Sequence, residues 1–293
     1  MYDNHNYSPN PLDNYNGDNW FVEQQSSGVR LQIKIKKKLF EKQSEFQYIE
    51  VYDTYEFGRM LTLDGLIMLT ERDEFAYHEM MVHVPMLSHA HPRNVLVIGG
   101  GDGGCLRELV KYPSIENIVQ VEIDAEVVNV SRKFFPNISS ANEHPKVNIV
   151  IDDALDYIKW CKTQFDIVIV DGSDPVGPAV KLFESNFIRN IYSVLSDDGI
   201  MVNQLGSPLY DEKRVNETLS HMNKSFYFTS LYVVHIPTYP SGVWGIGFGA
   251  KNDKFLKKPD EVSYLTIIDD LKYYNLGTHR AAFILPDYMH RSI

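Results

Sequence analysis

The sequence contains few cysteines and no long apolar run. Its 293 residues include only two cysteines, Cys105 and Cys161, which is too few for a disulfide framework and gives no zinc-ligand spacing. No stretch approaches the roughly 20 apolar residues of a membrane span, and the start of the chain lacks the basic and apolar segments of a signal peptide. We therefore expect a cytoplasmic protein in a reducing compartment, without a membrane partner.

Basic residues are also fewer than acidic ones. Lysine and arginine number 28 against 39 aspartates and glutamates, so the formal net charge is -11. This balance argues against nucleic acid or an anionic membrane as the main partner and is compatible with a polycationic ligand. Since 44% of the residues are hydrophobic, the chain can bury a large core in one or two domains.

The N-terminal part has two compositions. Residues 1–19 are rich in Asn, Asp, Tyr and Pro without apolar periodicity, which predicts a mobile extension. Residues 20–70 alternate apolar and polar side chains, and Asp64-Gly65 between two such runs is typical of a hairpin. We predict a small antiparallel β domain there, with the lysines at 36–38 in a solvated turn after a strand.

Residues 71–293 alternate between strand and helix patterns. The sequence Thr70-Glu-Arg-Asp73 predicts a capping box that opens a helix, which should end before Pro85. Buried strands are expected at 95–98, 118–121, 147–151, 167–170 and 200–202, and an edge hairpin at 231–236 and 243–248. We predict the fold class α/β, with a Rossmann-like doubly wound sheet. The edge hairpin favours the class I S-adenosylmethionine methyltransferase type, which often has such a hairpin.

A glycine-rich loop follows the first of these strands. The spacing Gly99-x-Gly101-x-x-Gly104 fits a nucleotide-binding turn, in which glycines allow a tight bend and close approach of a ligand. Asp102 would repel a pyrophosphate but suits the sulfonium and ammonium of an S-adenosyl nucleoside. The loop therefore favours an S-adenosyl ligand over NAD.

Carboxylates recur where the predicted strands end, at Asp102, Glu122, Asp153, Asp171 and Asp174. The carboxyl ends of parallel strands meet at one edge of a doubly wound sheet, so these side chains should ring one crevice. Asp171 and Asp174 are close enough in sequence to raise one another's pKa. Asp153 is explained equally well as a helix N-cap.

Several motifs occur together and in order: TERDEF, GGGDGG, VEID, DGSDPVGPA, PTYPSG and HRAAFILP. By these motifs and their order, the chain resembles the spermidine synthase family of polyamine aminopropyltransferases, and the resemblance extends from about Trp20 to the C-terminus. The resemblance implies transfer of an aminopropyl group from decarboxylated S-adenosylmethionine to a diamine, usually putrescine, without a metal or a cofactor. It also implies a homodimer or homotetramer formed partly through the N-terminal β domain.

The resemblance assigns roles to individual residues. Asp171 occupies the position of the family's general base. Residues implied to bind the donor nucleoside are Gln47, Gly99, Gly101, Asp102, Glu122, Asp153, Ala154 and Pro178. Residues implied to line the polyamine channel are Tyr77, His78, Asp102, Asp171, Asp174, Gln204 and Tyr239.

Two positions depart from the family pattern. Ala154 stands where many members have Gly, and Gly172 where Ser, Thr or Cys usually follows the base. Gly172 adds backbone freedom and removes a side-chain hydrogen bond, so we expect a looser catalytic loop. Alternative functions are use of agmatine, cadaverine or spermidine as acceptor, a putrescine N-methyltransferase, an NAD oxidoreductase, or a silent polyamine-binding homologue. Asp102 argues against the methyltransferase, since it would repel the carboxylate of intact S-adenosylmethionine.

Overall fold

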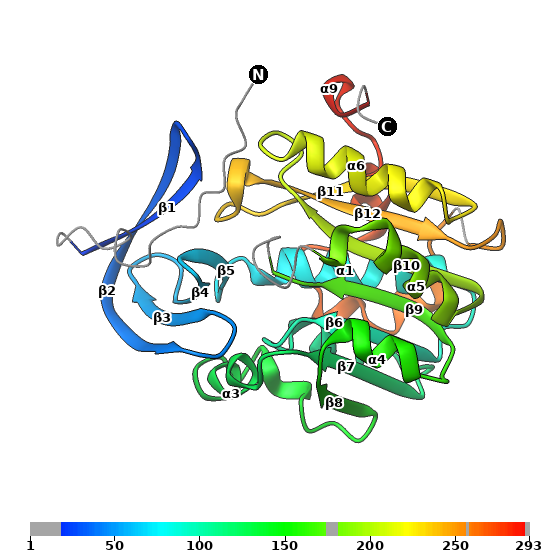
Figure 1. The fold of residues 1–293 in the computed structure, drawn as a ribbon, viewed down its shortest axis with the longest axis horizontal. Helices are drawn as coiled ribbons and strands as arrows, with labels where there is room; N and C mark the ends of the chain where they lie inside the picture. The colour runs from blue at the N-terminus through cyan, green and yellow to red at the C-terminus, as the bar shows by residue number, and fades with distance from the viewer. Residues whose placement is uncertain (1–18, 174–180, 256–257, 291–293) are drawn as a thin grey trace. The chain divides into compact units, whose positions relative to one another are not determined.

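The computed structural model describes residues 19–173, 181–255 and 258–290, and the helices, strands and contacts given below all lie within these ranges. The chain divides into two compact units, one that ends at Asp73 and one that begins at Glu74 (Figure 1). Within the described ranges, no helix is long and apolar enough to cross a membrane.

The N-terminal unit is a five-stranded antiparallel sheet in the order β1-β2-β3-β4-β5. Its strands are β1 Trp20–Ser26, β2 Val29–Gln43, β3 Tyr48–Thr54, β4 Arg59–Leu63 and β5 Leu66–Thr70. Asp64 and Gly65 join β4 to β5 with φ angles of 51° and 77°, the left-handed conformation that a tight hairpin turn requires. The predicted hairpin is therefore confirmed.

The prediction of a turn at 36–38 is wrong. The three lysines lie inside β2, which continues to Gln43. The neighbouring strand β3 supplies acidic partners, because Lys36 Nζ lies 3.2 Å from Asp53 and Lys38 Nζ lies 2.7 Å from Glu50. Cross-strand charge pairs of this kind stabilise a sheet, so the lysines remain in the ladder.

The C-terminal unit alternates helices and strands along the chain. Its strands are β6 Asn94–Gly99, β7 Asn117–Glu122, β8 Val147–Ile151, β9 Phe165–Asp171, β10 Leu195–Gly206, β11 Phe228–His235 and β12 Val243–Ala250. Its α-helices are α1 Glu74–Ser88, α2 Gly104–Leu109, α3 Ala125–Phe134, α4 Ala154–Trp160, α5 Ser185–Val194, α6 Glu212–Asn223, α7 Glu261–Leu265, α8 Leu276–Ala282 and α9 Asp287–His290. Short 3-10 turns lie at Ser139–Ala141, Pro240–Gly242 and Ile268–Asp270.

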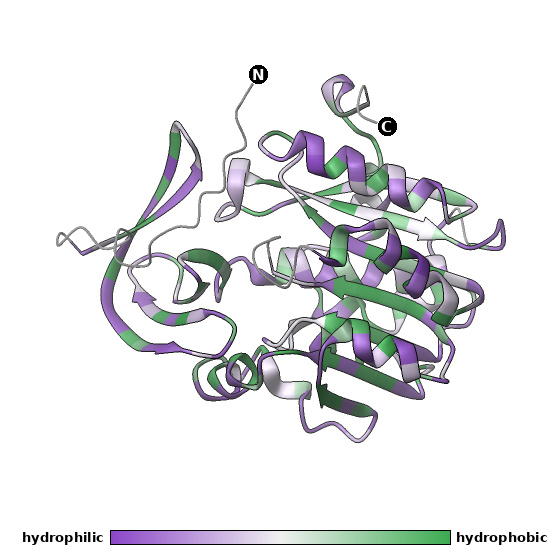
Figure 2. Ribbon diagram, viewed as in Figure 1, coloured by the Kyte–Doolittle hydropathy of each residue, from purple (hydrophilic) through white to green (hydrophobic). Residues whose placement is uncertain are grey.

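The seven strands form one sheet in the order β11-β12-β10-β9-β6-β7-β8. Strands β8, β7, β6, β9 and β10 are parallel, and β12 pairs antiparallel with β10 and β11. Helices α4, α5 and α6 lie over one face and α1 over the other (Figure 1). The central strands are mostly hydrophobic (Figure 2), as burial on both faces requires. The doubly wound fold and its edge hairpin are confirmed.

The predicted limits of α1 are wrong at both ends. Thr70 ends β5 and donates its hydroxyl to Asp73, whereas the helix begins only at Glu74. At the other end the helix passes through Pro85 to Ser88. Proline removes one helical hydrogen bond and disfavours this arrangement. Since nearly every residue of α1 is buried against α2, β9, β10 and β11, packing outweighs that cost.

Candidate active site

The turn after β6 packs directly on the end of β9. The Gly100 amide donates to the Asp171 carbonyl at 2.9 Å, and Gly99 has a φ of 78°. A side chain on Gly99 would collide with the Asp171 backbone, so only glycine fits this turn. In this structure Gly99 and Gly100 allow close approach of the Asp171 backbone, whereas the sequence pattern alone relates the glycines of this turn to close approach of a ligand. The backbone contact brings the loop that carries Asp102 beside the end of β9, at the point where β6 is flanked by β7 and β9.

Asp102 is a half-buried carboxylate with charged and polar partners. Its Oδ1 lies 3.2 Å from His78 Nε2 and accepts a 2.6 Å hydrogen bond from the Gly104 amide. Burial raises the pKa of Asp102, but the charge and hydrogen bond of His78 and the Gly104 amide outweigh it, so the pKa lies below its usual value. Asp102 is therefore a charge-compensated carboxylate.

Asp171 meets neutral donors instead. The Tyr77 hydroxyl donates to Oδ1 at 2.6 Å, and the Cys105 thiol donates to Oδ2 at 3.3 Å. Burial raises the pKa of Asp171, and the charge of Asp102 raises it further, while His78 and the two donors oppose this only in part. The pKa of Asp171 therefore lies above its usual value, which suits a carboxylate that must accept a proton.

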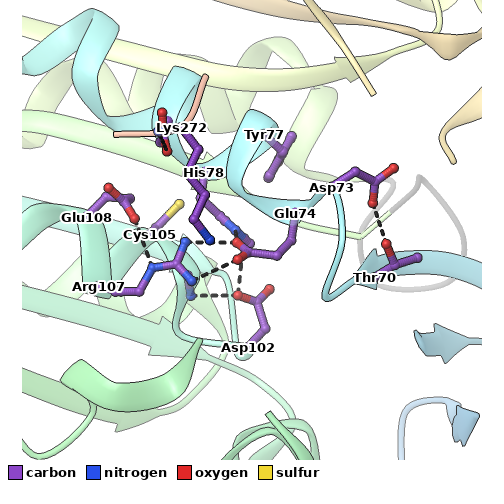
Figure 3. A network of polar contacts seen from close by, with 12 residues as sticks. Thr70, Asp73, Glu74, Tyr77, His78, Asp102, Cys105, Arg107, Glu108 and Lys272 are labelled. Carbon is purple, nitrogen blue, oxygen red and sulfur yellow. Dashed lines mark hydrogen bonds and ion pairs between the residues drawn. The ribbon is translucent and has the colours of Figure 1, made fainter. Parts of the chain in front are cut away.

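His78 is held between two carboxylates (Figure 3). Its Nδ1 lies 2.6 Å from Glu74 Oε2, while its Nε2 faces Asp102. Burial lowers the pKa of His78, but Asp102 and Glu74 raise it to about 10. The imidazole ring also covers Gly104, where a Cβ atom would overlap it. The last glycine of the loop thus accommodates this histidine.

His78, Asp102 and Asp171 each place one nitrogen or oxygen atom within 4.8 Å of the other two. These residue types also ligate metals, but an imidazole that carries protons on both nitrogens has no lone pair to offer. Two carboxylate oxygens at this separation can accept hydrogen bonds from a single ammonium group. The chemistry of the cluster therefore suits an amine better than a metal ion.

The nucleoside-binding residues predicted on the other side of the turn lie at the ends of β7 and β8. Glu122 ends β7, is buried, and accepts a 2.9 Å bond from the Asp124 amide. Burial raises the pKa of Glu122 to about 7. Asp153 caps α4 by accepting from the Leu155 amide at 2.8 Å, and Ala154 begins that helix. The capping interpretation of Asp153 holds, and its contact with a nucleoside stays a prediction.

An aromatic row lies beside the two carboxylates. The ring centroids of Tyr77 and Tyr239 are 5.8 Å apart, and those of Tyr239 and Trp244 are 4.9 Å apart. Trp244 Nε1 donates to Gln204 Oε1 at 3.2 Å. Gln204 Nε2 in turn donates to the carbonyls of Gly172 at 2.9 Å and Ser173 at 3.3 Å. The side chain of Gln204 therefore anchors the backbone that follows Asp171.

The structure brings together most of the residues predicted for the polyamine channel. Contacts link Tyr77, His78, Asp102, Asp171 and Tyr239, and Gln204 contacts the segment after Asp171. Two predicted residues, Asp174 and Pro178, lie outside the described residues. Gln47 belongs to the N-terminal unit, and its contact with a nucleoside stays a prediction.

Four contributors were not identified from the sequence: Glu74, Cys105, Arg107 and Trp244. Glu74 and His78 are four residues apart, and this spacing signals side chains that meet on one helix face. Arg107 and Cys105 have no such local signal in the sequence. Both lie on α2, whose packing brings Arg107 to Glu74 and Cys105 to Asp171.

Two family models match the chain. A model described as "Spermine/spermidine synthase domain" matches residues 74–258, and one described as "Spermidine synthase tetramerisation domain" matches residues 19–71. The boundary between these matches falls where the structure divides into two units.

Curated relatives and solved structures are similar over nearly the whole chain. A "Polyamine aminopropyltransferase" of a Thermoanaerobacter strain is 46% identical over 272 residues, which cover 92% of this chain and 96% of the relative. The protein of the same name from Bacillus subtilis is 40% identical over 92% of this chain and 97% of the relative. A spermidine synthase crystallised with the transition state analogue AdoDATO has a TM-score of 0.89 and 36% identity, covering 93% of this chain and 94% of that one. The spermidine synthase of Thermotoga maritima has a TM-score of 0.88 and 35% identity, covering 93% of each chain.

Proposed function

The chain belongs to the spermine/spermidine synthase family, and we propose that it transfers the aminopropyl group of decarboxylated S-adenosylmethionine to putrescine. The products are spermidine and 5'-methylthioadenosine. The amine nitrogen attacks the methylene carbon beside the sulfonium, the carbon–sulfur bond breaks with its electron pair on sulfur, and the amine proton passes to Asp171. The donor is a co-substrate, and the reaction needs no metal and no further cofactor.

One observation carries this proposal: of two neighbouring carboxylates, one has a charged partner and the other has neutral hydrogen-bond donors. Asp102 faces the charged His78, whereas Asp171 faces the hydroxyl of Tyr77 and the thiol of Cys105. An amine with a pKa of about 10.4 arrives protonated and becomes a nucleophile only after it loses a proton. Asp171 is the less compensated of the two carboxylates and therefore the better acceptor for that proton, so we assign Asp171 as general base and Asp102 to the ammonium group of the donor.

The surrounding contacts support these roles. Gln204 and Cys105 hold the base and the segment that follows it, which offsets the freedom expected from Gly172. The Tyr77–Tyr239–Trp244 row supplies aromatic faces for the methylenes and the charged end of a diamine. On the nucleoside side we propose that Glu122 accepts ribose hydroxyls, with Gln47, Gly99, Gly101, Asp153, Ala154 and Pro178 completing that site. Asp174 completes the amine side.

We further propose a cytoplasmic homodimer or homotetramer that assembles through the N-terminal sheet. The match of residues 19–71 to a tetramerisation model supports oligomer formation. Light scattering on the purified protein should give a multiple of 33.7 kDa. A single 33.7 kDa species would contradict this assignment.

A product assay tests the proposed reaction. The purified protein is incubated with putrescine and either decarboxylated or intact S-adenosylmethionine, and the nucleoside products are identified by mass spectrometry. We expect 5'-methylthioadenosine from the decarboxylated donor only. S-adenosylhomocysteine from the intact donor would instead identify a methyltransferase, and thermal stabilisation by both ligands without product would identify a silent binding protein.

The acceptor is tested by competition among putrescine, cadaverine, agmatine and spermidine. We expect putrescine to have the highest kcat/KM, because a nucleophile misplaced by about 1 Å can lose on the order of 100-fold in rate. A higher value for another amine would leave aminopropyl transfer intact and contradict the choice of acceptor.

A further inference from the structure

We propose that Glu74 and Arg107 are positioning residues that keep His78 as a fixed cation against Asp102. This inference rests on the proposed function, because it explains how the protein separates the roles of Asp102 and Asp171. Neither residue is assigned a role by the motifs of the sequence. Both act through His78.

The geometry begins on helix α1. Glu74 and His78 are one helical turn apart, and Glu74 Oε2 lies 2.6 Å from His78 Nδ1. Helix α2 supplies the second contact, because Arg107 Nη1 donates to Glu74 Oε1 and Nη2 to Oε2, each at 2.9 Å. This two-point pairing fixes the plane of the Glu74 carboxylate (Figure 3). The carboxylate in turn fixes the orientation of the ring.

Burial makes this arrangement sensitive to charge. The side chains of His78 and Glu74 are 2% and 5% exposed, so neither can exchange a protein partner for bulk water. Each ring nitrogen of His78 faces a carboxylate oxygen. Only the imidazolium form donates from both nitrogens, and a neutral ring would turn a lone pair toward one of the two carboxylates.

The other groups around His78 do not replace Glu74. Asp102 and Asp171 lie close to His78 on the loop after β6 and at the end of β9, and Arg107 pairs with Glu74. The charge of Arg107 also lowers the pKa of Asp102. The guanidinium of Arg107 also pairs with Glu108 through Nε at 2.8 Å. Removing the charge of Glu74 therefore leaves the buried imidazolium of His78 close to the half-buried guanidinium of Arg107, with Asp102 as the nearest remaining counterion of the imidazolium.

The test is a pH titration of the His78 ring by NMR in the wild type and in Glu74→Gln. The amide of glutamine keeps the size of the side chain and removes its charge. We expect the wild-type ring to stay protonated from pH 6 to 8.5, and the variant ring to titrate within that range. The His78→Gln variant assigns the signal. Glu143→Gln serves as the matched control, because Glu143 forms an exposed ion pair with Arg132 at 2.8 Å.

A kinetic readout accompanies the titration. At pH values where the ring of the Glu74→Gln variant is neutral, the pKa of Asp171 rises, since the His78 charge opposes that rise. The acid limb of kcat/KM in the variant should therefore extend into the range from pH 6 to 8.5, and each pH unit by which it moves lowers kcat/KM about tenfold on its acid side. A purely structural role of Glu74 would lower stability without moving this limb.

Two results would overturn the proposal. The first is a wild-type His78 that titrates near its unperturbed pKa of about 6.5, which needs no variant to detect. The second is a folded Glu74→Gln protein whose ring stays charged to pH 8.5; if that variant does not fold, Glu74→Asp takes its place and should show a smaller change in the same direction. The NMR readout needs no turnover, so an inactive wild type with a charged His78 would refute the proposed function and leave this inference standing.

Discussion

The loop after β6 carries Asp102 and the end of β9 carries Asp171. The two carboxylates lie close together but have different surroundings. Asp102 faces an imidazolium and a backbone amide, and its pKa is held below the usual value. Asp171 faces a hydroxyl and a thiol, and its pKa lies above the usual value. We propose that these two chemically identical side chains acquire different tasks from the charge of their partners. One is suited to hold a cation and the other to accept a proton.

The largest effect should follow from Asp171→Asn, which removes the proposed proton acceptor. General-base catalysis contributes typically about 10²–10⁴-fold, so kcat for release of 5'-methylthioadenosine should fall by that factor while nucleoside binding persists. Asp156→Asn is a suitable control, because Asp156 is exposed and pairs only with Lys159 within the described residues. If Asp171→Asn keeps more than a tenth of the wild-type kcat at neutral pH, Asp171 is not the base.

The pH dependence of stability should reveal the compensating partner of Asp102. The folded-state pKa of His78 is about 10, above its unperturbed value of about 6.5. Its contribution to stability is therefore fully present below pH 6.5 and is lost as the pH rises through about 10. The free energy of unfolding, measured with urea, should fall across this window by a few kcal/mol. The His78→Gln variant should lack most of that fall, and an equally steep curve would contradict the ion pair.

A smaller effect is expected for Asp102→Asn, which removes the proposed binding charge and leaves the proposed base, Asp171, in place. Loss of a hydrogen bond to a charged group costs about 1.5–3 kcal/mol, or roughly 10–100-fold in the dissociation constant for decarboxylated S-adenosylmethionine. Affinity for intact S-adenosylmethionine should fall less or rise, because its carboxylate is no longer repelled. Calorimetry with both donors measures this difference. Equal losses would refute the role given to Asp102.

The smallest effect is expected for the thiol that contacts Asp171. Cys105→Val keeps the bulk of the side chain and removes the donor, and a hydrogen bond contributes about 0.5–1.5 kcal/mol, so kcat should fall roughly 2–10-fold. Cys105→Ser keeps a donor and should retain more activity than the valine variant. Steady-state kinetics of the two variants and the wild type measure the contribution of the thiol, and equal rates in all three proteins would show that Cys105 does not help to position Asp171.

The sequence predicts the fold well because strand and helix periodicities are local signals. It misses the extension of α1 through Pro85 because tertiary packing outweighs a local preference there. It misses the strand position of the lysines at 36–38 because their acidic partners lie on a different strand. At the site, motif resemblance identifies both carboxylates and His78, but the pairing of α1 with α2 through Glu74 and Arg107 depends on a contact that no local pattern encodes.

The central claim is that Asp102 and Asp171 differ in charge compensation, and carboxyl NMR tests it most directly. The protein is labelled with ¹³C at aspartate carboxyl groups, and Asp102→Asn and Asp171→Asn assign the two signals. In the ligand-free wild type we expect Asp171 to titrate above the usual aspartate pKa of about 3.9 and Asp102 below it. The reverse order, or two coincident titrations at the usual value, would contradict the account.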